Sequence, residues 1–188
     1  MPAFLRQAPL IEPLTLAQAK AHLRIGEDAE DETIVALISA ARAHIEQAFS
    51  LALIAQSWTM VLDRWPRVPE ITLPLWPVIS IDKVKVVGEE GAALIIDEAH
   101  YVSLLAVRPA RLLRRPDRHW PQPGRSACGI EIEFTGGFGS AAADVPEPIR
   151  QALKIHLAAL YDDREGGASP GVPAAAAALL SPYAAVGL

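Results

Sequence analysis

A glycine-rich stretch that leads into a helix pattern is the first candidate for chemistry. It reads TGGFGSAAADVPEPIRQALKIHLAALYDDREGG and spans residues 135–167. A Walker-type phosphate loop needs a lysine and a Ser or Thr after its last glycine, and a dinucleotide fingerprint opens a helix directly after the first strand of a parallel unit. This stretch has no lysine near its glycines and follows strands of antiparallel pattern. It therefore predicts a hinge between a strand and the last helix.

Acidic residues gather at two places. Residues 27–32 precede a helix pattern, and they lack the glycine and the closing glutamate of a calcium-binding EF-hand loop. Acidic side chains at a helix N-terminus are stabilised by the helix dipole, which explains this run. Asp162, Asp163 and Glu165 instead gather at a helix C-terminus, where the dipole disfavours them. They could bind a cation or a partner's Arg or Lys, or they could form a solvated helix end. If the protein were an enzyme, these residues with a divalent metal would be the best candidates for its active site.

The other residue types that catalyse reactions form no known motif. The five histidines are scattered without an H-E-x-x-H pattern, and no serine lies in a G-x-S-x-G elbow. His156 lies on the apolar stripe of a helix pattern, which favours a buried core histidine. Cys128 is the single cysteine, so no internal disulfide can form. We expect no catalytic residue, no metal and no cofactor, and hence no enzyme.

A cluster of arginines is the most distinctive charge feature. The chain has a net charge of −5 at pH 7, yet residues 108–125 hold six arginines against one acid, Asp117. This Arg/Pro-rich loop could contact DNA phosphates or an acidic face of another subunit. With equal weight, it could be a solvated loop whose arginine stems cover a sheet. The arginines are Arg108, Arg111, Arg114, Arg115, Arg118 and Arg125.

Apolar residues at helical spacing predict helices at both ends of the chain. Thr15 and Gln18 form a capping-box pattern at the first helix, and Gly26 is the expected residue just past its end. Helices are predicted over residues 15–24, 31–50 and 147–164.

Between the helices the pattern changes to a period of two, which is typical of strands. Residues 130–135, IEIEFT, alternate most clearly, and Pro74 and Pro77 mark a corner between two earlier strands. We expect about six short strands in a small, mostly antiparallel sheet.

The sequence therefore predicts an α+β fold in a single domain over residues 1–188. A helical hairpin (13–50) and a C-terminal helix (147–165) would form a helical body, with a β lobe (57–135) between them. Residues 166–188 are rich in Ala, Pro and Gly and are expected to form a loose tail.

Composition narrows the class of protein further. Hydrophobic residues make up 51% and charged residues 21% of the 188, which is typical of globular proteins. The N-terminus does not match a signal peptide, and no apolar run approaches the roughly 18 residues that span a bilayer. We expect a protein made in a cytoplasm, without a membrane partner.

Four stretches of the chain, in order, carry a resemblance to a known family. They are PLTLAQAKAHLRI with the acidic turn and IVALISAARAHIEQAF; ALIAQSWTMVLDRWP; ITLPLWPVISIDKVKV with YVS further on; and IEIEFTGGFGSAAADVPEPIRQALKIHLAALYDDRE. Together they cover most of residues 13–165 and resemble the head–tail connector (adaptor) family of tailed phages, which also occurs in gene transfer agents.

This resemblance implies a structural virion protein. It would form a homo-oligomeric ring, commonly a dodecamer, between the portal protein and a tail-proximal connector or tail terminator protein, with DNA passing through the channel. It would lie at the head–tail interface of a virion or phage-like particle, after assembly in the bacterial cytoplasm. The helices would form the ring body, and the tail would dock on the portal through Leu179, Leu180, Pro182 and Tyr183. The alternative is a nucleic-acid-binding module that uses the Arg108–Arg125 loop.

Overall fold

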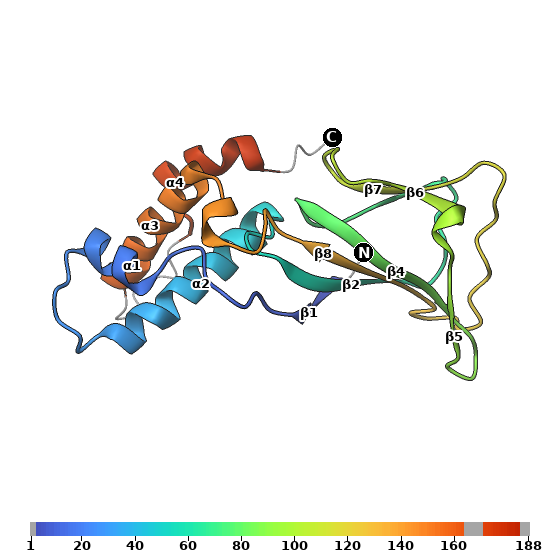
Figure 1. The fold of residues 1–188 in the computed structure, drawn as a ribbon, viewed down its shortest axis with the longest axis horizontal. Helices are drawn as coiled ribbons and strands as arrows, with labels where there is room; N and C mark the ends of the chain where they lie inside the picture. The colour runs from blue at the N-terminus through green and yellow to red at the C-terminus, as the bar shows by residue number, and fades with distance from the viewer. Residues whose placement is uncertain (1–2, 164–170, 185–188) are drawn as a thin grey trace. The chain divides into compact units, whose positions relative to one another are not determined.

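A computed structural model describes residues 3–163 and 171–184 of the chain. The chain divides into two compact units (Figure 1). The β unit comprises Met1–Pro9 and Ala55–Gly137, and the helical unit comprises Leu10–Ile54 and Phe138–Leu188. The chain thus passes between the units three times. The α+β class predicted from the sequence is confirmed, and a single domain over residues 1–188 stays a prediction.

The helical unit begins with α1, Leu16–Leu23. The predicted capping box is present: the Thr15 hydroxyl accepts from the Gln18 N–H, and the Gln18 side chain accepts from the Thr15 N–H. The prediction for Gly26 was wrong, because Arg24 takes the left-handed conformation past the helix end, with a φ of 59°.

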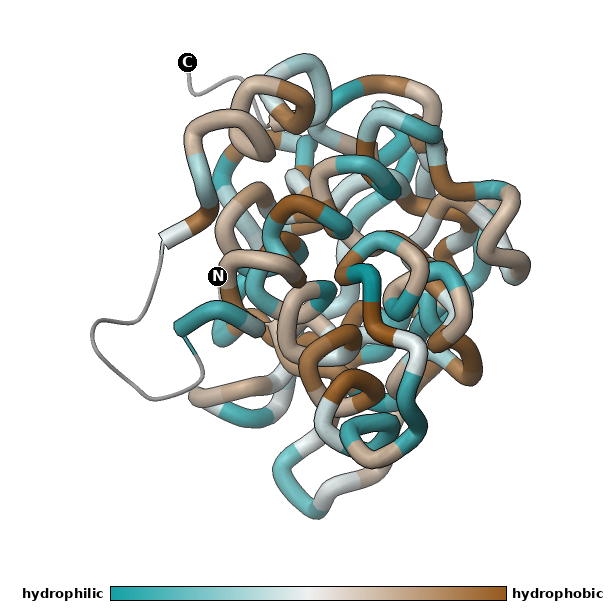
Figure 2. Tube along the Cα trace, turned by 90° about the vertical axis from the view of Figure 1, so that its left-hand side faces the viewer, coloured by the Kyte–Doolittle hydropathy of each residue, from teal (hydrophilic) through white to brown (hydrophobic). Residues whose placement is uncertain are grey.

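Helix α2, Asp31–Phe49, is the longest in the described part of the chain. Its buried apolar residues recur every three or four positions, as the sequence predicted. These are Ile34, Ile38, Ala41 and Ile45. Figure 2 shows hydrophobic stretches in brown and hydrophilic stretches in teal along the whole chain.

Helix α3, Glu147–Asp162, carries a second buried stripe that includes Ile149, Leu153 and Leu157. A fourth helix, α4, Ala174–Leu180, packs against α3 and is followed by the 3-10 turn Ser181–Tyr183. The prediction of a loose tail was therefore wrong for this stretch. Alanine has the highest helix propensity, and burial of Leu180 fixes the helix to its unit. No helix within the described residues could span a membrane.

The β unit contains a five-stranded sheet in the order β1-β2-β8-β4-β5, with all neighbours antiparallel. β1 pairs with β2 although the sequence predicted no strand there. The strands are β1 Ala3–Gln7, β2 Gln56–Leu62, β4 Val78–Val87, β5 Ala93–Ile95 and β8 Ile130–Gly136.

A second sheet of three strands has the order β3-β7-β6. Its strands are β3 Glu70–Thr72, β6 Tyr101–Leu104 and β7 Arg111–Arg114. The described residues thus hold eight strands in two sheets, and not about six in one. The stretch 108–125 is also not a single loop, because β7 lies within it.

The core of the β unit lies between the inward faces of these strands. Ile130, Ile132 and Phe134 of β8 are fully buried, as their alternation predicted. They share one hydrophobic cluster with Ile71 of β3 and Leu112 of β7. Buried residues of both sheets therefore form a common core, which leaves the opposite face of β8 for polar side chains.

Candidate functional site

The glycine-rich stretch forms the predicted connection between a strand and the last helix. β8 ends at Gly136, and the next residue, Gly137, has a φ of 144°, which glycine adopts readily. A Cβ added to Gly139 would lie 2.1 Å from the Asp144 carboxylate, which accepts a 2.8 Å bond from the Ala141 N–H. The glycines therefore serve a tight local turn, and α3 begins well beyond them.

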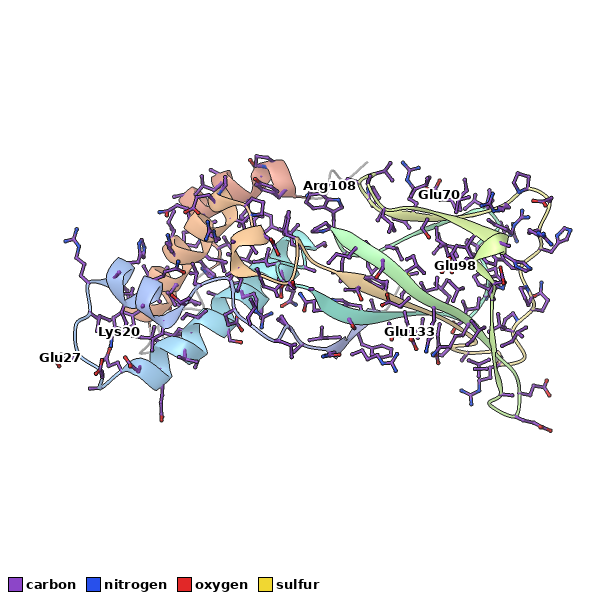
Figure 3. All side chains as sticks on the ribbon, in the orientation of Figure 1. Lys20, Glu27, Glu70, Glu98, Arg108 and Glu133 are labelled. Atoms are coloured by element: carbon purple, nitrogen blue, oxygen red, sulfur yellow. The ribbon has the colours of Figure 1, made fainter. Side chains whose placement is uncertain are left out.

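Three of the six arginines serve contacts inside the β unit. The Arg108 guanidinium lies 4.4 Å from the centre of the Trp76 ring. Arg108 is labelled in Figure 3. Arg111 pairs with Glu70 of the neighbouring strand β3 at 3.2 Å. Arg114 donates to the backbone carbonyls of Arg115 and Arg118. These three side chains therefore make contacts within the unit that carries them.

The other three arginines have exposed side chains. Arg115 directly follows β7, and Arg118 pairs weakly with its neighbour Asp117 at 3.6 Å. Arg125 lies near the 88–91 turn, since its guanidinium would be 3.1 Å from a Cβ at Gly91. Contact of these arginines with DNA or another subunit stays a prediction.

The acidic cluster at the end of α3 is only partly described. Asp162 is exposed, Asp163 is half-buried, and Glu165 lies outside the described residues. The Tyr161 hydroxyl donates to Glu30, which ties this helix end to the loop before α2. In the part of the chain that the structure describes, no three His, Cys, Asp or Glu side chains are arranged to hold a metal ion.

The predicted docking residues of the tail differ in exposure. Pro182 is exposed and Leu179 is half-buried, whereas Leu180 is fully buried against its own unit. Tyr183 packs edge-on against Phe138, with ring centres 6.2 Å apart. Leu180 thus holds the tail in place, and docking of the tail on a portal stays a prediction.

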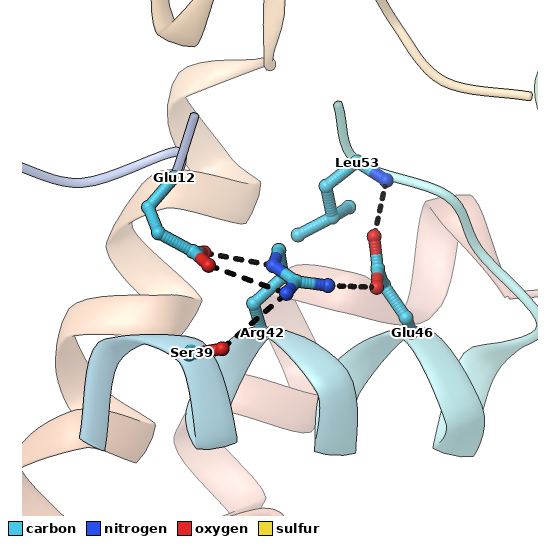
Figure 4. Close-up of polar contacts among 5 residues, drawn as sticks. All are labelled: Glu12, Ser39, Arg42, Glu46 and Leu53. Carbon is cyan, nitrogen blue, oxygen red and sulfur yellow. Dashed lines mark hydrogen bonds and ion pairs between the residues drawn. The ribbon is translucent and has the colours of Figure 1, made fainter. Parts of the chain in front are cut away.

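A buried ionic network that the sequence analysis missed lies in the helical unit (Figure 4). Arg42 donates to Glu12 at 2.7 Å and to Glu46 at 2.7 Å, and Glu46 accepts from the Leu53 N–H at 2.8 Å. Burial disfavours the charged guanidinium, but the two carboxylates outweigh it and hold the pKa of Arg42 above its ordinary value. The sequence signal was the i,i+4 spacing of Arg42 and Glu46 beside Ala41 and Ile45.

A second ionic network lies on the polar face of the five-stranded sheet. Glu133 of β8 pairs with Arg6 of β1 at 2.7 Å and with Lys85 of β4. Burial raises the pKa of Glu133, but these two cations outweigh it and lower the pKa below its ordinary value. The network links three strands across the sheet, and Figure 3 labels Glu133 within it.

The expectation of a core histidine at position 156 is confirmed. His156 is fully buried, and its Nε2 lies 2.9 Å from Nδ1 of His44. Burial lowers the pKa of His156, and the nearby His44 adds to this effect. The pair belongs to the packing of α2 against α3.

Part of the chain matches a known protein family. The family model described as phage gp6-like head-tail connector protein matches residues 13–89. No curated protein matches the chain.

Several solved structures contain similar chains. One of these chains comes from the neck of an empty gene transfer agent particle, computed with C6 symmetry. It is 26% identical with a TM-score of 0.87, and the match covers 100% of this chain and 97% of that one. A chain from the virion of a native gene transfer agent is 25% identical with a TM-score of 0.85 and the same coverage. A chain from a native neck computed with C12 symmetry is 24% identical, over 98% and 97% of the two chains, with a TM-score of 0.76.

The α+β fold matches that of a neck protein, and together with the family match it supports a structural connector (adaptor) role for the chain. The chain is thus similar to phage head–tail connector proteins over residues 13–89, and to chains of gene transfer agent particles over its whole length.

Proposed function

We propose that the chain is the subunit of a closed ring that joins the portal to the tail in a virion or phage-like particle. The observation that carries this proposal is the match to a gene transfer agent neck over 100% of the chain, with a TM-score of 0.87. Because the likeness extends over both units, the whole chain fits the connector role.

The proposed ring is a dodecamer of identical subunits. Solved necks that contain similar chains have been computed with C6 and C12 symmetry. In such a ring each subunit uses two different faces, one toward each neighbour, and the rotation closes the ring.

The proposed partners lie on the two sides of the ring. The tail segment that includes α4 would dock on the portal protein, and a tail-proximal connector or tail terminator protein would bind the other side. DNA would pass through the channel, and assembly would take place in the bacterial cytoplasm. The role is structural and requires no catalysis.

The test is native mass spectrometry of the purified protein mixed with the portal assembly from the same genome. We expect a discrete gain equal to a whole ring of 20.2 kDa chains. Leu179→Asp, on the half-buried part of α4, should abolish portal binding, whereas Val35→Asp, on an exposed position of α2, should leave it intact.

Failure to bind the portal would contradict the connector role in this particle. The rival function, a nucleic-acid-binding module, would then predict tight binding to duplex DNA. If the three exposed arginines each contact a phosphate, the slope of log affinity against log salt would be about −3. A connector that lets DNA slide past should show a weak affinity instead.

A further inference from the structure

The two edges of the five-stranded sheet carry exposed apolar side chains. β5 consists of Ala93, Leu94 and Ile95, and all three are exposed. Leu94 is 57% and Ile95 61% exposed, although neither is polar. At the opposite edge, Phe4 and Leu5 of β1 are 52% and 43% exposed.

Soluble proteins usually protect the edges of their sheets with charged residues, prolines or covering segments, because an open edge pairs with other chains. β5 contains no charged residue and no proline. The one charged residue of β1 is Arg6, and it pairs with Glu133 on the face of the sheet. No described strand lies beyond either edge. Both edges therefore have the features of strands that pair with another chain.

The order of the strands decides how the two edges could meet. Each neighbouring pair in the series β1-β2-β8-β4-β5 is antiparallel, so four reversals leave β1 and β5 running in the same direction. The edges also lie on opposite sides of one sheet. A ring needs two different faces of this kind, since each copy uses one face toward each neighbour.

We propose that β5 of one copy pairs with β1 of the next copy, as parallel strands, so that the sheet continues from subunit to subunit. The occupant of each open edge is thus a second copy of this chain. Backbone hydrogen bonds would supply the pairing, and burial of Phe4, Leu5, Leu94 and Ile95 would supply its apolar contact. This inference rests on the proposed ring, and it assigns the surface that closes it.

Disulfide cross-linking tests the pairing directly. In a Cys128→Ser background, which removes the native exposed thiol, cysteines are placed at Phe4 and Leu94 in one variant and at Leu5 and Ile95 in another. Paired strands bring such residues within the roughly 7 Å between Cα atoms that a disulfide allows. After mild oxidation with the portal present, we expect a covalent ladder in steps of 20.2 kDa.

The matched control replaces the β5 cysteine by one at Val68, which is 60% exposed but lies outside β5. The pair Phe4→Cys and Val68→Cys should give no ladder. A ladder of equal length in this control would show that the oxidation traps random collisions, and it would overturn the inference.

Charged residues at the edge give an independent test. Leu94→Lys with Ile95→Lys should remove the ring from the native mass spectrum, while Val68→Lys should leave it. Unchanged tryptophan fluorescence and far-UV circular dichroism would show that the variants still fold. If the wild-type ring forms on the portal but neither the cysteines nor the lysines act as expected, the edge pairing is refuted and the connector role stands. If the wild-type chain forms no ring at all, both are refuted.

Discussion

Replacing Arg42 by leucine removes the cation that Glu12 and Glu46 share inside the helical unit. The side chain of Glu46 is 9% exposed, so the substitution leaves a buried carboxylate without its cation. Breaking a buried pair from one side costs about 3–5 kcal/mol. The Glu12 side chain is 28% exposed and can be solvated, so loss of its ion pair with Arg42 adds less than about 1 kcal/mol. We expect the free energy of unfolding to fall by about 4 kcal/mol.

A second substitution should restore part of this loss. Glu46→Gln removes the charge but keeps an amide oxygen that can accept from the Leu53 N–H. The double variant Arg42→Leu/Glu46→Gln should therefore be more stable than Arg42→Leu alone, by about 2 kcal/mol, because no buried charge remains. A simple sum of two harmful substitutions would predict the opposite order.

Urea unfolding with two probes measures these differences unit by unit. All four tryptophans, Trp58, Trp65, Trp76 and Trp120, lie in the β unit, so their fluorescence reports on that unit. Far-UV circular dichroism reports mainly on the helices, which belong to the other unit.

The control for this experiment is Lys154→Met. Lys154 lies 3.9 Å from Glu147, whose side chain is 62% exposed, so its loss should cost less than about 1 kcal/mol. The reasoning is refuted if Arg42→Leu shifts the circular dichroism transition no more than Lys154→Met does. It is also refuted if the double variant is less stable than Arg42→Leu.

Three further predictions concern the helical unit. Burial lowers the pKa of His156, so in the folded protein this side chain binds a proton only at a lower pH than in the unfolded chain, where it does so near pH 6.5. Stability should therefore be full above that pH and fall as the pH drops below it, and His156→Leu should flatten this fall in melting temperatures measured from pH 7.5 to about 5. Leu180→Ala should lower the stability of the helical unit by about 2–4 kcal/mol in urea, since its side chain is fully buried; an unchanged midpoint would contradict the packing of α4. Thr15→Ala should cost about 1 kcal/mol through loss of the capping box, and Thr15→Ser should recover most of it in the same assay.

Local signals in the sequence were enough to predict α1, α2 and α3. The capping box at Thr15 and the apolar spacing along α2 involve residues within a few positions of one another. The residue that caps the end of α1 was not predicted, because it is Arg24, which takes a left-handed conformation that its residue type disfavours. The following chain is held by two ion pairs of Lys20, to Asp28 and Asp31, and such contacts are not local in the sequence.

The elements that the sequence analysis missed depend on distant partners. β1 has no clear alternation of its own and exists as a strand through its pairing with β2, some fifty residues away. Likewise, α4 packs against α3, and its Leu180 is fully buried. The arginines of residues 108–125 were found by composition, but the contacts of Arg108 with Trp76 and of Arg111 with Glu70 required the folded β unit.

The Arg42 network also connects the three places where the chain enters or leaves the helical unit. Glu12 lies just after the first passage, and Leu53 lies just before the second. The Leu53 carbonyl accepts from the N–H of Phe138, the first residue after the third passage, at 3.1 Å. Arg42 thus binds Glu12 directly and reaches Leu53 and Phe138 through Glu46. A stable ionic network at this point fixes all three connections within one unit.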